Sequence, residues 1–151
     1  MADEATVTMS FTGLPTEISK TLTGLSASLT PANDDQKWYF KTTTVGTAQN
    51  VVLIAGGLFK RVAIAQASAH DTADAADEVK FLLVRNLDSS ENIFLSLDNN
   101  ETNAVADIDA VKVPANMTWF GFFDKLKVGD LHARASGSCE CEVYAIIDVS
   151  P

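Results

Sequence analysis

The side chains that could perform chemistry are few in this chain and lie far apart in the sequence. There are two cysteines, Cys139 and Cys141, and two histidines, His70 and His132. Nucleophilic catalysis requires a serine or cysteine with a base beside it, and the sequence holds no Gly-x-Ser-x-Gly pattern. Two isolated histidines indicate surface residues rather than a catalytic pair. We therefore expect no catalytic residues and no enzymatic activity.

The Cys139-x-Cys141 pair is expected to consist of buried, reduced thiols. Residues two apart in an extended strand point the same way, with their Cα atoms about 6.6 Å apart. That separation lies at the far edge of disulfide geometry. A metal ion would need further ligands, and His132, the nearest histidine, is expected to face the opposite way.

The acidic residues suggest two further kinds of site, and neither is supported. Asp98, Asn100, Thr102 and Asp109 match four liganding positions of an EF-hand loop, but the required glycine is replaced by Asn103 and strand signals flank the segment. The 20 acidic residues offer many carboxylate pairs for glycoside hydrolysis, and no spacing selects one. The segment is interpreted as a polar turn, and no metal is expected.

The net charge and the hydropathy exclude several classes of partner. With 20 acidic and 11 basic residues the formal charge is −9, which disfavours nucleic acid and anionic membrane surfaces. The run Val51–Gly57 lacks the glycine pattern of a nucleotide-binding loop, so no cofactor is expected. The sequence has neither a membrane-length apolar run nor a basic signal-peptide start. We expect synthesis in the cytoplasm.

The elements that must position these residues are strands. Apolar and polar residues alternate with a period of two along most of the 151 residues, which is one domain's length. We count about nine or ten short strands separated by turn signals, with at most one short helix, over 67–78. This spacing is typical of an antiparallel sandwich or barrel. We predict an all-β antiparallel β-sandwich of jelly-roll type.

Residues 1–30 form either an extended N-terminal arm or first strands, ahead of a β-sandwich domain over 31–151. Val7, Met9 and Phe11 alternate with threonine and serine, so they present one apolar face. Two interpretations stay open. The strand is the first of the protein's own sandwich, or it adds to the sheet edge of a partner through main-chain hydrogen bonds.

The most unusual cluster contains Met117, Trp119, Phe120, Phe122 and Phe123. Regular alternation places Phe120 and Phe122 on one face and the other three on the opposite face. A half-exposed strand would not carry aromatic residues on both faces. Either this strand is central and covered twice, or one face lies in a subunit interface, where aromatic residues and methionine are enriched.

Trp38 and Tyr39 raise the alternative of an aromatic sugar-binding platform. Trp38 and Phe40 are predicted on one face of a strand over 36–45, with Tyr39 on the other. Trp38 is expected to face the core, which weakens that alternative.

From Lys80 onward the chain holds an ordered series of strand-like segments: Lys80–Leu87, Ile93–Leu97, Val111–Pro114, the aromatic strand, Leu131–Ala135 and the closing strand from Cys139. This order of features resembles the C-terminal half of small β-sandwich virion proteins of tailed bacteriophages, including capsid decoration (cement) proteins. The Pro-Gly turn that usually precedes the aromatic strand in those proteins appears here as Pro114-Ala115.

The resemblance implies a structural protein on the capsid exterior without an active site. It implies binding to the major capsid protein and self-association, and the first oligomer that it suggests is a homotrimer. A tail or fibre component of the same particle is one alternative, and a carbohydrate-binding module is another. The interface candidates are Val7, Met9, Phe11, Met117, Trp119, Phe120 and Phe122.

Overall fold

The computed structural model describes residues 5–8, 26–29, 36–48, 51–56, 72–97 and 110–149. This part of the chain is built from strands, and its one helical segment is a single 3-10 turn, η1 (Val128–Asp130). The strands are β1 (Ala5–Thr8), β2 (Ser26–Leu29), β3 (Gln36–Val45), β4 (Val51–Val52), β5 (Glu78–Asn86), β6 (Ile93–Ser96), β7 (Val111–Val113), β8 (Thr118–Lys127), β9 (His132–Ala135) and β10 (Cys139–Asp148). The predicted all-β class is therefore confirmed.

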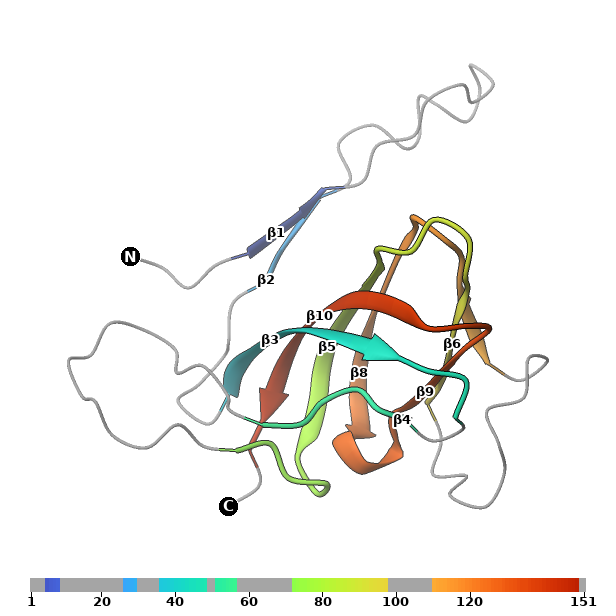
Figure 1. Cartoon of the computed structure of the whole chain (residues 1–151). Helices are drawn as coiled ribbons and strands as arrows, with labels where there is room; N and C mark the ends of the chain where they lie inside the picture. The colour runs from blue at the N-terminus through green and yellow to red at the C-terminus, as the bar shows by residue number, and fades with distance from the viewer. Residues whose placement is uncertain are drawn as a thin grey trace.

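Eight of these strands form two four-stranded antiparallel sheets that face each other (Figure 1). The first sheet has the order β3-β10-β5-β8, and the second has the order β4-β9-β6-β7. The pairs are nested along the chain: β3 with β10, β4 with β9, β5 with β8, and β6 with β7. Such a nested hairpin, rolled into two sheets, is the jelly-roll topology. The predicted jelly-roll sandwich is confirmed.

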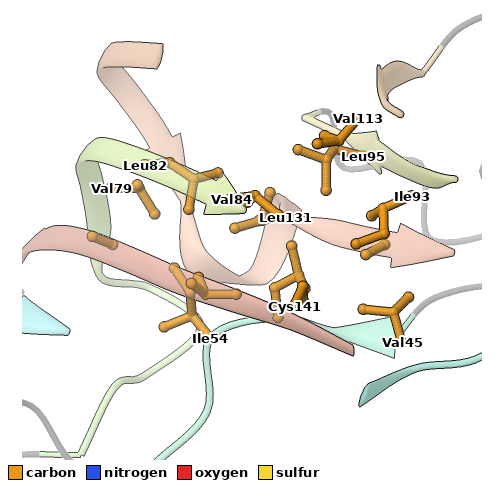
Figure 2. Close-up of a cluster of buried hydrophobic side chains, with 14 of the residues drawn as sticks. Val45, Ile54, Val79, Leu82, Val84, Ile93, Leu95, Val113, Leu131 and Cys141 are labelled. Atoms are coloured by element: carbon orange, nitrogen blue, oxygen red, sulfur yellow. The ribbon is translucent and has the colours of Figure 1, made fainter. Parts of the chain in front are cut away.

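The core lies between the inner faces of the two sheets. β10 shows the alternation most clearly, because Cys139, Cys141, Val143, Ala145 and Ile147 are all fully buried. Figure 2 shows inner side chains of the first sheet meeting those of the second. Both thiols are free and buried, as predicted. Burial of apolar surface on this scale is the main stabilising contribution in a domain of this size.

Asn86, at the end of β5, is a buried polar residue that ties the two sheets together. Its Nδ2 donates to the Glu91 carbonyl at 2.8 Å and to the Val113 carbonyl of the second sheet at 3.2 Å. Its Oδ1 accepts the Asp88 N–H at 3.0 Å and the Cys139 thiol at 3.0 Å. Since each polar atom of the amide has partners, its burial is compensated.

Tyr39 points into the core, and its hydroxyl is held by the chain beyond β4. The hydroxyl donates to the Leu53 carbonyl at 3.2 Å and accepts the Ala55 N–H at 3.2 Å. Tyr39 lies opposite Ala145 of β10, whose small side chain leaves room for the ring. The expectation that Trp38 faces the core is therefore wrong: Trp38 lies on the outer face of the sheet, with Phe81 and Ile146.

Two further segments, 50–55 and 67–78, are described only in part. The continuous apolar run 50–55 favours a strand covered on both faces, but β4 has two residues, lies at a sheet edge, and leaves Val52 exposed. The described part of 67–78 begins at residue 72 and contains a turn, in which the Asp74 carboxylate accepts the Ala76 N–H. Residues 67–71 lie outside the described residues.

The two N-terminal strands pair with each other and, within the described residues, with neither sandwich sheet. β1 and β2 form an antiparallel two-stranded ribbon in which Val7 lies opposite Ala27. Figure 1 shows this ribbon beside the sandwich. Met9 and Phe11 lie outside the described residues. Because an isolated two-stranded ribbon is marginally stable in water, we expect it to contact other surfaces. Pairing of β1 with a sheet edge of a partner stays a prediction.

The hydrogen bonds of Asn86 give the first testable prediction. In Asn86→Ala the partly buried carbonyl of Glu91 and the buried carbonyl of Val113 lose this donor, and the free energy of unfolding is expected to fall by about 2–4 kcal/mol. Urea unfolding measures this change. A loss below about 0.5 kcal/mol, the range of ordinary surface substitutions, would contradict the bridging role.

The buried thiols predict a loss of stability at alkaline pH. Burial raises the pKa of Cys139 to about 11 and that of Cys141 to about 12, from an ordinary value of 9.0. In the unfolded chain both thiols ionise near the ordinary value, whereas in the folded chain they stay neutral. The stability that depends on neutral thiols is therefore present below 9.0 and is lost as the pH rises toward 11 to 12.

Urea unfolding at neutral and at alkaline pH tests this loss. The double variant Cys139→Ala, Cys141→Ala is expected to show a smaller decrease than the native chain. An identical decrease in both proteins would show that the thiols do not contribute.

Candidate functional site

The outer face of the first sheet carries two neighbouring rows of apolar side chains that cross all four strands. The register places Trp38, Ile146, Phe81 and Phe122 side by side in one row. It places Phe40, Tyr144, Leu83 and Phe120 side by side in the next. We call these eight residues, six of which are aromatic, the aromatic face.

The aromatic face is best packed at its centre and most exposed toward the sheet edges. Phe81 and Ile146 on the central strands are 3% and 4% exposed, whereas Phe40 and Phe122 on the edge strands are 42% and 56% exposed. Ring centroids lie 4.6 Å apart for Phe40 and Tyr144, and 5.4 Å apart for Phe81 and Phe122. These distances are typical of favourable aromatic pairs. The rings thus pack against one another, while Phe40 and Phe122 keep much of their surface exposed.

Charged groups border the aromatic face at both ends of the strands. At one end Lys80 forms a salt bridge with Glu78 and donates to the Asp124 carbonyl at 3.0 Å. The ammonium group of Lys80 holds the pKa of Glu78 below its usual value. At the other end Arg85 forms a salt bridge with Glu142, with 3.3 Å between Arg85 Nη1 and Glu142 Oε2. An exposed apolar patch with a polar rim is characteristic of a protein-binding surface.

The second sheet presents a different outer face. Its ring, Phe94, is 7% exposed and lies under the guanidinium group of Arg134, which is 5.2 Å from the ring centroid. Lys112 and Arg134 are the register partners of Phe94 on the two neighbouring strands. This chain therefore covers the aromatic ring of the second sheet with its own cation, whereas Phe40 and Phe122 keep much of their surface exposed.

The predicted aromatic cluster falls on both faces of β8, with the predicted alternation. Phe120 and Phe122 belong to the aromatic face. Trp119 packs against the core from the inner side, with its ring centroid 6.3 Å from that of Phe123. Met117 precedes β8 and is 55% exposed. Because β8 is an edge strand, the interpretation that it is central and covered twice is wrong.

Of the other members of the aromatic face, Trp38 and Phe40 are correctly predicted on one strand face, whereas Phe81, Leu83, Tyr144 and Ile146 are not predicted as contact residues. The sequence signal for these residues lies in two segments that are apolar at both odd and even positions. In β5 the outer Phe81 and Leu83 alternate with inner residues such as Leu82 and Val84. In β10 the outer Tyr144 and Ile146 alternate with the inner Ala145 and Ile147. A strand that is apolar at nearly every position is covered on both faces, so this pattern pointed to a covered outer surface.

The residues considered for catalysis or metal binding do not come together in the described part of the chain. There, no group of three or more His, Cys, Asp or Glu side chains could hold a metal ion. His132 is partly exposed on β9, while His70 and the segment 98–109 lie outside the described residues. Among the described residues no helix is long and apolar enough to cross a membrane.

Comparison with known proteins adds little to this geometry. No family model matches the chain, and no curated protein does. Among solved structures, the coat protein of tobacco streak virus is similar, with a TM-score of 0.40 and 11% sequence identity over 79% of this chain and 88% of that chain. A TM-score of 0.40 is too low for a functional conclusion to rest on it. The fold and site define a jelly-roll sandwich with an apolar outer sheet face.

The packing of the aromatic face predicts different costs for its central and peripheral members. Phe81→Ala is expected to lower the free energy of unfolding by about 3–5 kcal/mol, as for other buried phenylalanines. Phe122→Ala removes a ring that is more than half exposed and is expected to cost much less. Thermal or urea unfolding of the two variants measures the difference. Equal costs would show that Phe122 stabilises the fold rather than serving as a contact surface.

Proposed function

We propose that this chain is a bacteriophage virion structural protein, a capsid decoration protein that binds the outer capsid lattice through its aromatic face. The observation that carries the proposal is the exposure of Phe40 and Phe122 at the margins of an otherwise packed aromatic sheet surface. The resemblance of the C-terminal half to cement proteins of tailed bacteriophages supports the same role. The proposed location is the capsid exterior, after synthesis in the host cytoplasm.

The size of the exposed patch suits a partner that offers many equivalent sites. An aromatic side chain buries about 150–250 Å², so covering the exposed parts of Phe40 and Phe122 removes roughly 200 Å² from water. At about 25 cal/mol per Å² this contributes roughly 5 kcal/mol. Association costs about 4–15 kcal/mol in lost translational and rotational freedom. A single copy would therefore bind weakly through these rings alone.

Self-association would overcome this weakness. Several linked copies that bind a regular lattice together gain avidity, because each later contact is intramolecular. The homotrimer implied by the resemblance would supply three such contacts to the major capsid protein. Binding to the assembled lattice and not to free subunits stabilises the capsid by mass action.

The aromatic face favours a protein partner over a sugar. Its rings are interleaved with Leu83 and Ile146, and charged groups at its rim, Lys80 and Arg85, are already paired with carboxylates. Sugar recognition needs polar groups placed to orient the ligand. The negative charge of −9 also suits an outer surface better than contact with packaged nucleic acid.

The test is the copy number in purified virions, combined with a matched pair of variants. A number comparable to that of the major capsid protein is expected for decoration, whereas far fewer copies would indicate a tail or fibre component. Phe40→Lys is expected to lower occupancy at least about tenfold, a loss of about 1.4 kcal/mol. Val52→Lys places the same charge on a residue of the second sheet that is 53% exposed, against 42% for Phe40, and should leave occupancy unchanged.

Absence of the chain from virions would overturn the proposal. A glycan array would then test the carbohydrate-binding alternative. Equal occupancy of the Phe40→Lys and Val52→Lys variants would show that the chain binds through another surface.

A further inference from the structure

β8 combines three features that a strand at the edge of a sheet rarely combines. It is ten residues long, it carries aromatic side chains on both faces, and β5 is its sole pairing partner among the described strands. Trp119 and Phe123 on its inner face are only partly buried. Proteins usually shorten, charge or cover such edges, because an open strand is a template for pairing with another chain.

The backbone of β8 presents hydrogen-bonding groups to its open side. The Asn86 N–H donates to the Met117 carbonyl at 2.9 Å, so Arg85 and Thr118 form a non-hydrogen-bonded pair between β5 and β8. The N–H and C=O of Thr118 then point away from β5. Alternation along the strand gives Phe120 and Phe122 the same orientation. Among the described residues none pairs with these groups, which leaves them for main-chain pairing with another chain.

The side chains of β8 are arranged symmetrically about Gly121. The sequence Trp119-Phe120-Gly121-Phe122-Phe123 has an aromatic residue at each of the two positions on either side of the glycine. If two copies of β8 pair antiparallel with Gly121 opposite Gly121 of the second copy, Phe120 lies opposite Phe122 on the outer face. Trp119 then lies opposite Phe123 on the inner face. Aromatic pairs in such positions stabilise a sheet.

Gly121 is required where the strand is most crowded. A Cβ atom there would lie 2.9 Å from the Trp119 ring and 3.0 Å from the Phe123 ring, which both lean over the glycine. In the antiparallel pairing Gly121 and its copy form a non-hydrogen-bonded pair, in which Cα atoms approach to about 4.5 Å. The flanking Phe120 and Phe122 pairs then exchange main-chain hydrogen bonds.

The charges along the β8 edge also favour antiparallel pairing. One end of β8 carries Lys125 and Lys127, and the Glu78 carboxylate at that end is already paired with Lys80. At the other end the Asn116 N–H donates to the carbonyl of Asp88 at 2.8 Å, which places the acidic turn 88–91 beside the start of β8. Antiparallel pairing brings the lysine end of one copy toward the acidic turn of the other.

We propose that two copies of this chain associate through β8, antiparallel about a two-fold axis at Gly121, to join their first sheets into one continuous sheet. The contact buries the open edge and sets the two aromatic faces side by side on a single surface. It is an isologous contact, in which each copy contributes the same residues. This proposal goes beyond capsid binding and does not depend on it, since it concerns the chain alone in solution.

The contact is small compared with permanent interfaces. Phe122 and Met117, at 56% and 55% exposed, are the most exposed large apolar residues at this edge, and a standard stable interface buries about 800 Å² per partner. The dimer should therefore dissociate on dilution. A two-fold contact combines with a three-fold contact to give a hexamer, so assemblies containing it hold an even number of chains.

Sedimentation equilibrium of the full chain over a wide concentration range tests the proposal. At high concentration the measured mass of the native chain is expected to be twice the monomer mass of 16.2 kDa, or another even multiple of the monomer mass. Phe122→Pro removes the main-chain N–H that faces the open side, and about tenfold or weaker association is expected. Circular dichroism verifies that this variant keeps its strands.

A charge-reversal pair provides the matched control. Lys125→Glu is expected to weaken association, because it places like charges opposite the acidic turn. Lys41→Glu makes the same change of net charge on the exposed surface of β3, at the far edge of the sheet, and should leave association unchanged. A native chain that is monomeric or trimeric throughout, or equal behaviour of these two variants, would overturn the proposal.

Discussion

β10 pairs along its length with β3 on one side and with β5 on the other, and its register determines both surfaces of the first sheet. Side chains alternate with a period of two, so a slip of one residue would exchange the inner and outer sets. In the observed register Cys139, Cys141 and Val143 enter the core, and Tyr144 and Ile146 join the outer rows. The core and the aromatic face are therefore consequences of one pairing.

The outer faces of the two sheets differ in how their aromatic residues are covered. In the second sheet the Arg134 side chain of the same chain lies over the Phe94 ring. The first sheet supports its rings mainly with one another, which leaves Phe40 and Phe122 with exposed edges. The charged groups of Lys80 and Arg85 at the two ends of the patch are paired with carboxylates of the same chain. What stays unsatisfied is apolar surface, and a protein partner would cover it.

The sequence predicted the architecture well because its strands alternate over long, well-bounded segments. The closing strand alternates from Cys139 onward, and so do the segments that bury Ile93 and Leu95, and Leu131, Ala133 and Ala135. The nested order of the sheets followed from the fold class. These features are local or depend on hydrophobic burial, which the sequence displays directly.

The outer face was harder to predict, because alternation separates two faces without saying which one is inside. Trp38 and Tyr39 belong to opposite phases of β3, and both are large aromatic residues. Tyr39 and not Trp38 faces the core because Ala145, its small neighbour on β10, leaves room for the ring. The Leu53 carbonyl beyond β4 also accepts a hydrogen bond from the Tyr39 hydroxyl. Both are distant in sequence. The edge position of β8 likewise depends on strand order, which no local pattern contains.

The aromatic face is proposed to be a contact surface in the assembled particle. Covalent footprinting with a small radical reagent, applied to the free chain and to purified virions, measures whether this face becomes covered. We predict that Phe40 and Phe122 are labelled in the dilute free chain, where the proposed β8 contact is dissociated, and protected on the virion, while Val52 of the second sheet is labelled equally in both. Equal labelling of Phe40 and Phe122 in the two states would contradict a contact role for the aromatic face.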